Sequence, residues 1–443
     1  MPELIRPEDD NYDSARLAWN LAADQHPAAI VIARSADEVV DAVNWARENG
    51  LRVAPQTTGH GAPGLPDLSG TLLLKTALYQ GDGDIEIDSN AATARVPAGA
   101  PVGDVVAAAA ERGLALLHGS SPTVGLVGYL LGGGLSSYSR TYGLACNRVA
   151  SFQVVTEDGA TVAADAVSNP DLFWALRGGG GGYGVVTAVE IELMPMSEVF
   201  AGATFLPASM APQVLDAWLN WTRNAPESAT TDFRIMRLPP FEEIPEPIRG
   251  QTVVCVDGVI TDQIVGEEFA GLLDELGPAV MGGWGLMPVA DVVRLHGDPE
   301  DPVPGTGGSL MLGGLDENAA RAFLDAAGDD SGSSLIVAEI RHLGGALSRP
   351  AEDGGVLGHL DAEYVFNGIG LAAGPDMSAK ATADLDQLVA AMQPWARESK
   401  FFNFTERDFT LSDCLPPEAM VRLLSIRNEY CPDGLFVAPG GRD

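Results

Sequence analysis

Lysine is scarce in this sequence, and so are the features of nucleic-acid-binding and membrane proteins. Only Lys75, Lys380 and Lys400 occur among 443 residues, and 26 Lys and Arg stand against 61 Asp and Glu, a net charge of −35. Such an excess of negative charge repels phosphate backbones and anionic lipid headgroups. The N-terminal stretch MPELIRPEDDNYD has no basic or apolar region, and no apolar run is long enough to span a bilayer. We therefore expect a cytoplasmic protein without nucleic-acid or membrane partners.

Residue patterns of structural metal sites and disulfide frameworks are also missing. The six His show no HxxH or HExxH spacing, and the cysteines form no CxxC or Cys/His cluster. We expect no bound metal and four free, buried thiols. The cysteines are Cys146, Cys255, Cys414 and Cys431.

What the sequence does contain predicts an α+β protein of more than one domain. Hydrophobic residues make up 46% of the chain, enough for a large core. Near the N-terminus, Ser35 and Glu38 form a capping box that opens a helix over Ala36–Glu48, between strands at Ala28–Ala33 and Leu51–Ala54. This order is typical of a β-α-β unit.

Beyond Pro195 the pattern changes to alternating strands interleaved with amphipathic helices, which predicts an antiparallel sheet covered on one side by helices. The Pro- and acid-rich stretch at 297–304 predicts a solvated loop. The expected strands are Thr231–Leu238, Thr252–Ile260, Ser334–Leu343 and Glu363–Ile369, and the helices include Gln213–Thr222 and Ser378–Met392.

Two glycine-rich segments could approach a ligand. Gly178–Gly184 can be written as GxGxxG, but a helix precedes it and a strand follows, which is the reverse of a dinucleotide-binding fingerprint. Pro122–Gly134 is the better candidate, because small residues at that density let backbone amides meet a large flat or phosphorylated ligand. Close packing against a neighbouring helix is the alternative.

Six motifs occur together in one order along nearly the whole chain. They are TTGHG at 57–61, SPTVGLVGYLLGGG at 121–134, YGLACN at 142–147, NPDLFWALRGGGGGYGVVT at 169–187, FFNF at 401–404 and YCPDGLF at 430–436. In these motifs the chain resembles the berberine bridge enzyme-like FAD-linked oxidases of the vanillyl alcohol oxidase and p-cresol methylhydroxylase (PCMH) superfamily.

The resemblance implies a two-part, PCMH-type FAD-binding domain that encloses the substrate domain. The FAD-binding domain would comprise residues 1–198, with the C-terminal segment 397–443 returning to it, and the substrate domain would comprise 199–396. In the family, the His at the position of His60 is bonded to the 8α-methyl group of the flavin. Bicovalent members have a Cys where this chain has Ser121, so the resemblance implies a single attachment.

The resemblance also implies which residues bind FAD. The loop 56–61 and the segment 121–134 would hold the pyrophosphate and the isoalloxazine, and Asn147 and the backbone at 184–186 would line the cofactor. The FFNF motif would form a C-terminal strand, from which Asn403 would approach the isoalloxazine. The predicted cofactor-binding residues are Gln56, Thr57, Thr58, Gly59, His60, Gly61, Ser121, Pro122, Thr123, Val124, Gly125, Gly128, Tyr129, Gly132, Gly133, Gly134, Gly143, Asn147, Gly184, Val185, Val186 and Asn403.

The catalytic base is less evident, because Phe401 occupies the place where the family often has a Tyr. On the strand Glu363–Ile369, Tyr364 shares an apolar face with Phe366, and we expect Arg341 to stabilise its ionised form. A tyrosine that merely packs its ring is the alternative. Further candidates are His342, as a neutral base beside Arg341, and Tyr138, with His359 more typical of a loop.

The function that follows is hydride transfer from a small organic substrate to flavin N5, with dioxygen restoring the flavin. An alcohol, a sugar or a C–H or C–N centre of a secondary metabolite are all open as substrates. The alternatives are a non-redox cyclase that uses the flavoprotein scaffold and its apolar pocket, and a flavin-binding protein without turnover.

Overall fold

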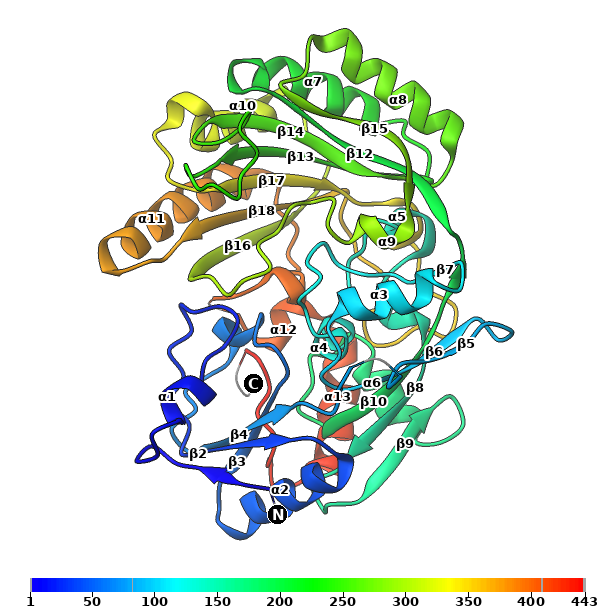
Figure 1. The fold of residues 1–443 in the computed structure, drawn as a ribbon, viewed down its shortest axis with the longest axis vertical. Coiled ribbons are helices and arrows are strands. Elements are labelled where there is room, and N and C mark those ends of the chain that lie inside the picture. Colours follow the sequence, from blue (N-terminus) through cyan, green and yellow to red (C-terminus); the bar gives the residue numbers. More distant parts are fainter. Residues whose placement is uncertain (1, 82, 408, 441–443) are drawn as a thin grey trace.

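Two β-rich regions are stacked along the long axis of the molecule (Figure 1). The computed structural model describes residues 2–81, 83–407 and 409–440. The lower region contains a four-stranded sheet, a five-stranded sheet and a short strand pair, and the upper region contains a seven-stranded sheet. The predicted α+β fold is confirmed.

The four-stranded sheet begins the chain and has the order β1-β2-β4-β3. Strands β2, β4 and β3 are parallel, so helix α2 (Ala36–Glu48) serves as the crossover between β2 and β3. The α2 helix begins where predicted, because the Ser35 side chain accepts a hydrogen bond from the backbone N–H of Glu38. The strands are β1 (Leu4–Ile5), β2 (Ala29–Ala33), β3 (Arg52–Gln56) and β4 (Thr71–Thr76).

The five-stranded sheet is antiparallel, with the order β5-β6-β10-β8-β9. Its strands are β5 (Glu86–Asp88), β6 (Thr93–Pro97), β8 (Val149–Val155), β9 (Thr161–Asp165) and β10 (Val185–Glu192), and the short pair is β7 (Leu114–Ala115) with β11 (Met194–Pro195). The helices of this region are α1 (Tyr12–Ala15), α3 (Val102–Ala110), α4 (Leu126–Leu131), α5 (Ser139–Tyr142), α6 (Pro170–Leu176), α12 (Leu411–Cys414) and α13 (Pro417–Tyr430).

The upper sheet is antiparallel throughout, with the order β15-β12-β14-β13-β17-β18-β16. Its strands are β12 (Glu198–Pro207), β13 (Ala229–Arg237), β14 (Thr252–Ile260), β15 (Met281–Pro288), β16 (Gly305–Leu312), β17 (Val337–His342) and β18 (Tyr364–Leu371).

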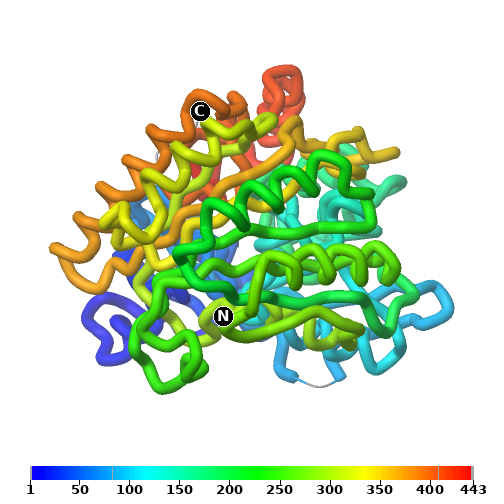
Figure 2. Tube along the Cα trace, turned by 90° about the horizontal axis from the view of Figure 1, so that it is seen from above, coloured from blue at the N-terminus to red at the C-terminus, as the bar shows by residue number. Residues whose placement is uncertain are grey.

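Helices cover one face of the upper sheet, as predicted, and the other face meets the lower region. Figure 2 shows the covering helices from above. They pack on a core that includes Trp218, Phe233 and Phe366. The opposite face shares a second core with the lower region, which joins Val259 and Val365 to Tyr129. The covering helices are α7 (Ala211–Thr222), α8 (Gln263–Leu276), α10 (Glu317–Ala327) and α11 (Pro375–Met392), while α9 (Val289–Val292) follows β15.

The C-terminal segment returns to the lower region. Val53 in β3 donates its N–H to the carbonyl of Leu435, and Val437 donates to the carbonyl of Val53. The expectation of a strand at the FFNF motif is wrong. Phe402–Phe404 form a short 3₁₀ turn instead. The turn is favoured because it buries Phe401 and aims the Asn403 side chain at the backbone of Gly134. The boundaries at 198 and 396 stay predictions.

All four cysteines are buried and outside disulfide bonds, as the sequence predicts. Within the described ranges, no helix combines the length and apolarity that crossing a bilayer requires.

A buried cation joins the two regions. The guanidinium of Arg140, in α5, donates to main-chain carbonyls at the ends of β13 and β17 and in the loop before β13. We expect Arg140→Met to lower the free energy of unfolding by about 2 to 4 kcal/mol, because it leaves buried carbonyls without donors. Urea unfolding measures the loss, with the exposed Arg112→Met as the control; equal effects would contradict the assignment. The acceptors are Ala225, Pro226, Ala229 and Leu343.

The net charge of −35 predicts a second property of the whole fold. Repulsion among the acidic groups weakens as the Debye length falls from about 10 Å at 0.1 M salt to about 3 Å at 1 M. The Tm should therefore rise with NaCl over that range. A Tm that stays flat or falls in a thermal melt series would show that the carboxylates are too well paired for repulsion to matter.

Candidate functional site

His60 lies in a tight loop directly after β3. The loop bends at Gly59, whose φ is +88°, and a Cβ there would lie 2.7 Å from the Cβ of Ala18. The His60 ring stacks on Trp19 with 3.9 Å between ring centroids, and its Nε2 lies 3.1 Å from Oγ1 of Thr123. Burial lowers the pKa of His60 to about 4. The imidazole is therefore neutral near pH 7 and retains a nucleophilic lone pair.

The segment 121–134 lies against this loop. Gly125 precedes helix α4, and a Cβ on it would lie 2.9 Å from Cγ2 of Thr57, so the two loops can meet only at a glycine. The hydroxyls of Ser121 and Thr123 are 3.2 Å apart. By contrast, Cβ positions at Gly61 and Gly128 have no neighbouring atom within 4 Å. The loop of His60 and the segment 121–134 thus form one cradle with open space at Gly61 and Gly128.

The far end of the segment contacts the C-terminal turn. Asn403 accepts a hydrogen bond from the N–H of Gly134 at 2.8 Å, and a Cβ at Gly132 would collide with the same amide. The structure therefore brings Asn403 to the glycine segment, while its approach to the isoalloxazine stays a prediction.

Other predicted cofactor residues make contacts inside the protein. The Gln56 side chain bonds to Gln25 and Lys75, and the Asn147 side chain bonds to the backbone of Gly355 and Leu357. The carbonyl of Thr58 accepts a hydrogen bond from the N–H of Trp19. A Cβ on Gly184 would lie 2.5 Å from Val154, while Val185 and Val186 pair with β8. A role of these residues in FAD binding stays a prediction.

Several buried polar atoms of the lower region suit a large ligand with polar edges. The hydroxyl of Tyr129, whose ring packs against Gly119 and Gly134, has no hydrogen-bond partner among the described residues. The same holds for the hydroxyl of Tyr138 and for Nε2 of His118. A neutral His, a glycine cradle and unsatisfied buried hydroxyls together fit FAD.

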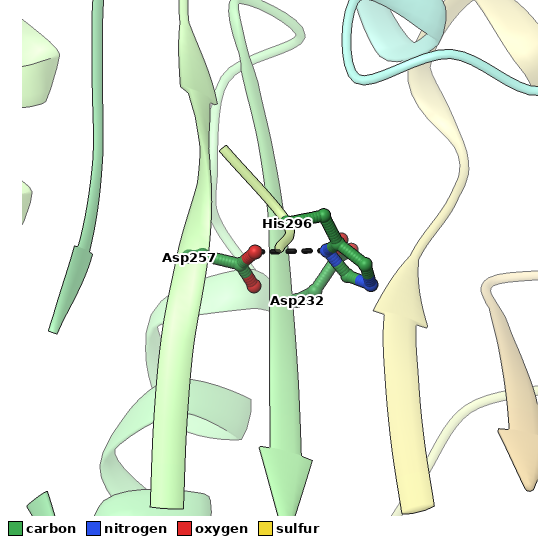
Figure 3. A group of neighbouring side chains, drawn as sticks. All are labelled: Asp232, Asp257 and His296. Atoms are coloured by element: carbon green, nitrogen blue, oxygen red, sulfur yellow. Dashed lines mark hydrogen bonds and ion pairs between the residues drawn. The ribbon is translucent and has the colours of Figure 1, made fainter. Parts of the chain in front are cut away.

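Six ionisable residues gather on the face of the upper sheet that meets the lower region, and we call them the ionisable cluster. Figure 3 shows the contact of His296 with Asp257, and Asp232 next to the same imidazole ring. Nδ1 of His296 lies 2.9 Å from Asp257 and 4.0 Å from Asp232, and its Nε2 lies 3.5 Å from Glu339. The members are Asp232 and Arg234 of β13, Asp257 of β14, Glu339 and Arg341 of β17, and His296 from the loop after α9.

Two arginines complete the cluster. Arg234 donates to Asp257 at 2.8 Å, and Arg341 lies 3.2 Å from Asp232. Arg341 also bonds to Glu339 at 2.7 Å. Register explains the arrangement, because Asp232 pairs with Arg341 and Arg234 pairs with Glu339 across β13 and β17.

The cluster contains a carboxyl group that titrates near neutrality. Burial, opposed by Arg341, raises the pKa of Asp232 to about 7. Burial and Arg234 disfavour protonation of His296, but Asp257 and Glu339 outweigh them and raise the pKa of His296 to about 10. At pH 7 His296 is a cation and Asp232 can accept or release a proton.

The carboxylates and imidazole of Asp232, Asp257 and His296 are close enough to hold a metal ion. However, Arg234 and Arg341 already neutralise both carboxylates, and a protonated His296 has no lone pair to offer. We interpret the group as a salt-bridge network, and the absence of a metal stays a prediction.

The cluster lies next to the cofactor loops. The guanidinium of Arg341 sits 5.6 Å from the centre of the Phe404 ring, adjacent to Asn403. Two residues after His296, Asp298 accepts a hydrogen bond from the hydroxyl of Ser120 at 2.6 Å. A ligand in the cradle would therefore lie opposite titratable groups.

The expected catalytic tyrosine faces the other way. Tyr364 and Phe366 belong to the core under the helices, and the Tyr364 hydroxyl lies 2.8 Å from Oγ1 of Thr222 in α7. His342 of β17 pairs with Tyr364 of β18 and shares its face. Arg341, the residue before His342, therefore lies on the opposite face of the sheet, because neighbouring residues of a strand alternate. The expectation that Arg341 would stabilise an ionised Tyr364 is wrong; burial instead raises the pKa of Tyr364.

The other candidates also differ from expectation. The cation beside His342 is Arg140, at 3.0 Å, not Arg341; burial first and then Arg140 lower the pKa of His342. Tyr138 is buried with its ring edge-on to His118, 5.6 Å between centroids. His359 is exposed in a loop. The ionisable cluster was not predicted from the sequence. The signal for it was the charged residues within the apolar runs of β13 and β14, namely Asp232, Arg234 and Asp257.

Comparison with known proteins supports the interpretation that the glycine cradle belongs to an FAD-binding domain. A family model described as an FAD binding domain matches residues 27–165. (R)-6-hydroxynicotine oxidase of Paenarthrobacter nicotinovorans is 33% identical over 222 residues, 48% of each chain. The chain spans about half the length or less of the curated relatives it matches.

Solved structures extend the likeness to nearly the whole chain. BBE-like 1 of Physcomitrella patens superposes with a TM-score of 0.84 at 21% identity over 99% of this chain and 96% of its own, which shows the shared fold. 6-Hydroxy-D-nicotine oxidase of Arthrobacter nicotinovorans gives a TM-score of 0.82 at 25% identity over 98% and 96%.

Fold and site together define a flavoprotein with a PCMH-type FAD-binding domain and an antiparallel-sheet substrate domain. The chain contains an FAD-binding domain, shares the fold of a berberine bridge enzyme-like protein, and is similar to FAD-linked oxidoreductases over a little less than half of its length.

Proposed function

We propose that this protein is an FAD-linked oxidase, with the cofactor attached through His60, that removes a hydride from a small organic substrate. The observation that carries the proposal is the position of the ionisable cluster opposite the loops of His60, Thr123 and Asn403. FAD supplies the hydride acceptor and passes the electrons to dioxygen. The substrate is an alcohol, a sugar or a C–H or C–N centre of a secondary metabolite.

The protein's own residues supply proton transfer and positioning. A hydride leaves an alcohol, phenol or amine more easily when a base takes the neighbouring proton. Asp232, whose pKa is raised to about 7, is the member of the cluster that can take that proton near neutrality. Arg341, 3.2 Å away, holds its carboxylate in place, and His296 keeps a positive charge beside it.

The attachment is supported by the state of His60. Its neutral imidazole is held between the Trp19 ring and the Thr123 hydroxyl. Ser121 occupies the position where a second attachment would need a thiol, so we propose one covalent bond only.

Anaerobic mixing of the purified, yellow protein with a panel of alcohols, sugars, amines and phenols tests the activity. The expected result is bleaching of the flavin by at least one class and formation of hydrogen peroxide once air is admitted. Conversion of a substrate without bleaching would indicate the non-redox cyclase, and a lack of any conversion would indicate binding without turnover.

A further inference from the structure

The loop between α9 and β16 is largely exposed, as its Pro- and acid-rich sequence predicts, but it also contacts the lower region. Near its end, Asn20 of the lower region makes two hydrogen bonds with the backbone of Gly305, each 3.1 Å long. The N–H of Leu21 donates to the carbonyl of Val303. Residues 296–305, which we call the linking segment, therefore connect the substrate domain to the residues that cover His60.

Two contacts of the linking segment lead to His60. The indole Nε1 of Trp19, the ring that stacks on His60, donates to the carbonyl of Glu300 at 3.1 Å. Asp298 accepts from the hydroxyl of Ser120 at 2.6 Å. Ser120 is followed by Ser121, whose hydroxyl contacts Thr123, the partner of His60. The linking segment thus contributes one carboxylate, that of Asp298, whose contacts lead through residues 120–123 to the buried His60 and whose charge acts on that imidazole.

We propose that Asp298 is a positioning residue for covalent attachment of FAD, with its carboxylate stabilising the positive charge that the His60 imidazole acquires as the bond forms. This inference rests on the proposed attachment through His60. Attachment forms one bond between an imidazole nitrogen and the 8α carbon and breaks one C–H and one N–H bond. The two electrons of the C–H bond pass to the flavin ring and then, with two protons, to dioxygen, which becomes hydrogen peroxide.

The need for a nearby anion follows from the surroundings of His60. Burial is the main influence on His60 and lowers its pKa to about 4, so a cation there is disfavoured, whereas the contact with Thr123 and the charge of Asp298 act in the opposite direction. A neutral imidazole is a good nucleophile, but it becomes cationic at the moment of attack. A fixed carboxylate nearby stabilises that state more than the starting state, which is the condition for a faster reaction.

The test follows attachment itself rather than turnover. Apoprotein of the 443-residue chain from a riboflavin-deficient host is mixed with FAD in air, and flavin that precipitates with the protein in acid is measured over time. Asp298→Asn should slow attachment by about tenfold or more, the size expected for one partly buried charge interaction. Asp298→Glu should restore most of the rate, because it returns the charge. Asp301→Asn, an exposed acid of the same segment, should match the parent.

A second measurement separates attachment from binding. Non-covalent FAD affinity, read from quenching of flavin fluorescence at short times, should stay unchanged in Asp298→Asn. If that variant does not fold, Ser120→Ala, which removes the donor that holds the carboxylate, should show slowed attachment in its place. If Asp298→Asn attaches FAD at a rate within twofold of the parent, or only as much more slowly as its affinity for FAD falls, the proposed role of Asp298 is wrong and the proposed attachment through His60 is unaffected. Absence of covalent flavin in the parent overturns the proposed attachment and this inference together.

Discussion

Acid denaturation of the purified protein should leave most of its flavin on the polypeptide, and His60→Ala should release all of it. His60 is a neutral imidazole with one nitrogen at Thr123, so one nitrogen is free to bond to carbon. Its ring is also held in one plane by the Trp19 stack. The variant removes the nucleophile while the glycine cradle is retained, so FAD should still bind reversibly. Absorbance of the precipitate and of the supernatant near 450 nm measures the two fractions.

The other nucleophiles near the cradle explain why no flavin should remain in the variant. Burial raises the pKa of Cys146 to about 12, so its thiol is protonated at neutral pH and unreactive. Ser121 has a hydroxyl, which is a far weaker nucleophile without an adjacent base. The exposed His26→Ala should retain covalent flavin like the parent and serves as the control. Residual covalent flavin in His60→Ala would show that the attachment lies elsewhere.

Local signals in the sequence predicted much of the fold. The capping box at Ser35 placed α2, and alternation placed four of the seven strands of the upper sheet, β13, β14, β17 and β18, together with its covered face. These features depend on residues a few positions apart, which the sequence displays directly. The FFNF motif was misjudged as a strand, because the bond from Gly134 to Asn403 comes from a residue far away in the chain.

The candidate site was predicted in part for the same reason. His60, Thr123 and Asn403 belong to motifs, and in the structure His60 contacts Thr123 while Asn403 contacts Gly134. The ionisable cluster could not be derived, because it requires β13 to lie between β14 and β17 and His296 to reach it from a loop. Alternation placed Tyr364 on the correct face, but the sequence did not show that the cofactor loops lie beyond the other face.

The ionisable cluster leads to the second large effect that we expect. Asp232→Asn should lower the rate of flavin reduction by about 10² to 10⁴-fold, the usual cost of removing an essential base. The asparagine keeps the shape of the side chain and a hydrogen-bond acceptor for Arg341. A fall in the rate is therefore caused by the missing proton acceptor and not by a cavity. Tyr364→Phe, which removes a hydroxyl on the opposite face, should stay within a few-fold of the parent. Anaerobic stopped-flow mixing with a substrate found in the panel measures both.

The pH dependence identifies the group. Burial raises the pKa of Asp232 to about 7, so the carboxylate form that accepts a proton increases as pH rises through that value. The rate of flavin reduction in the parent should therefore rise from about pH 6 to pH 8 and then level off, and this step should be absent in Asp232→Asn. His296, with a pKa raised to about 10, stays charged throughout this range and contributes no step. A rate that falls as pH rises, or a step that persists in the variant, would show that another group accepts the proton.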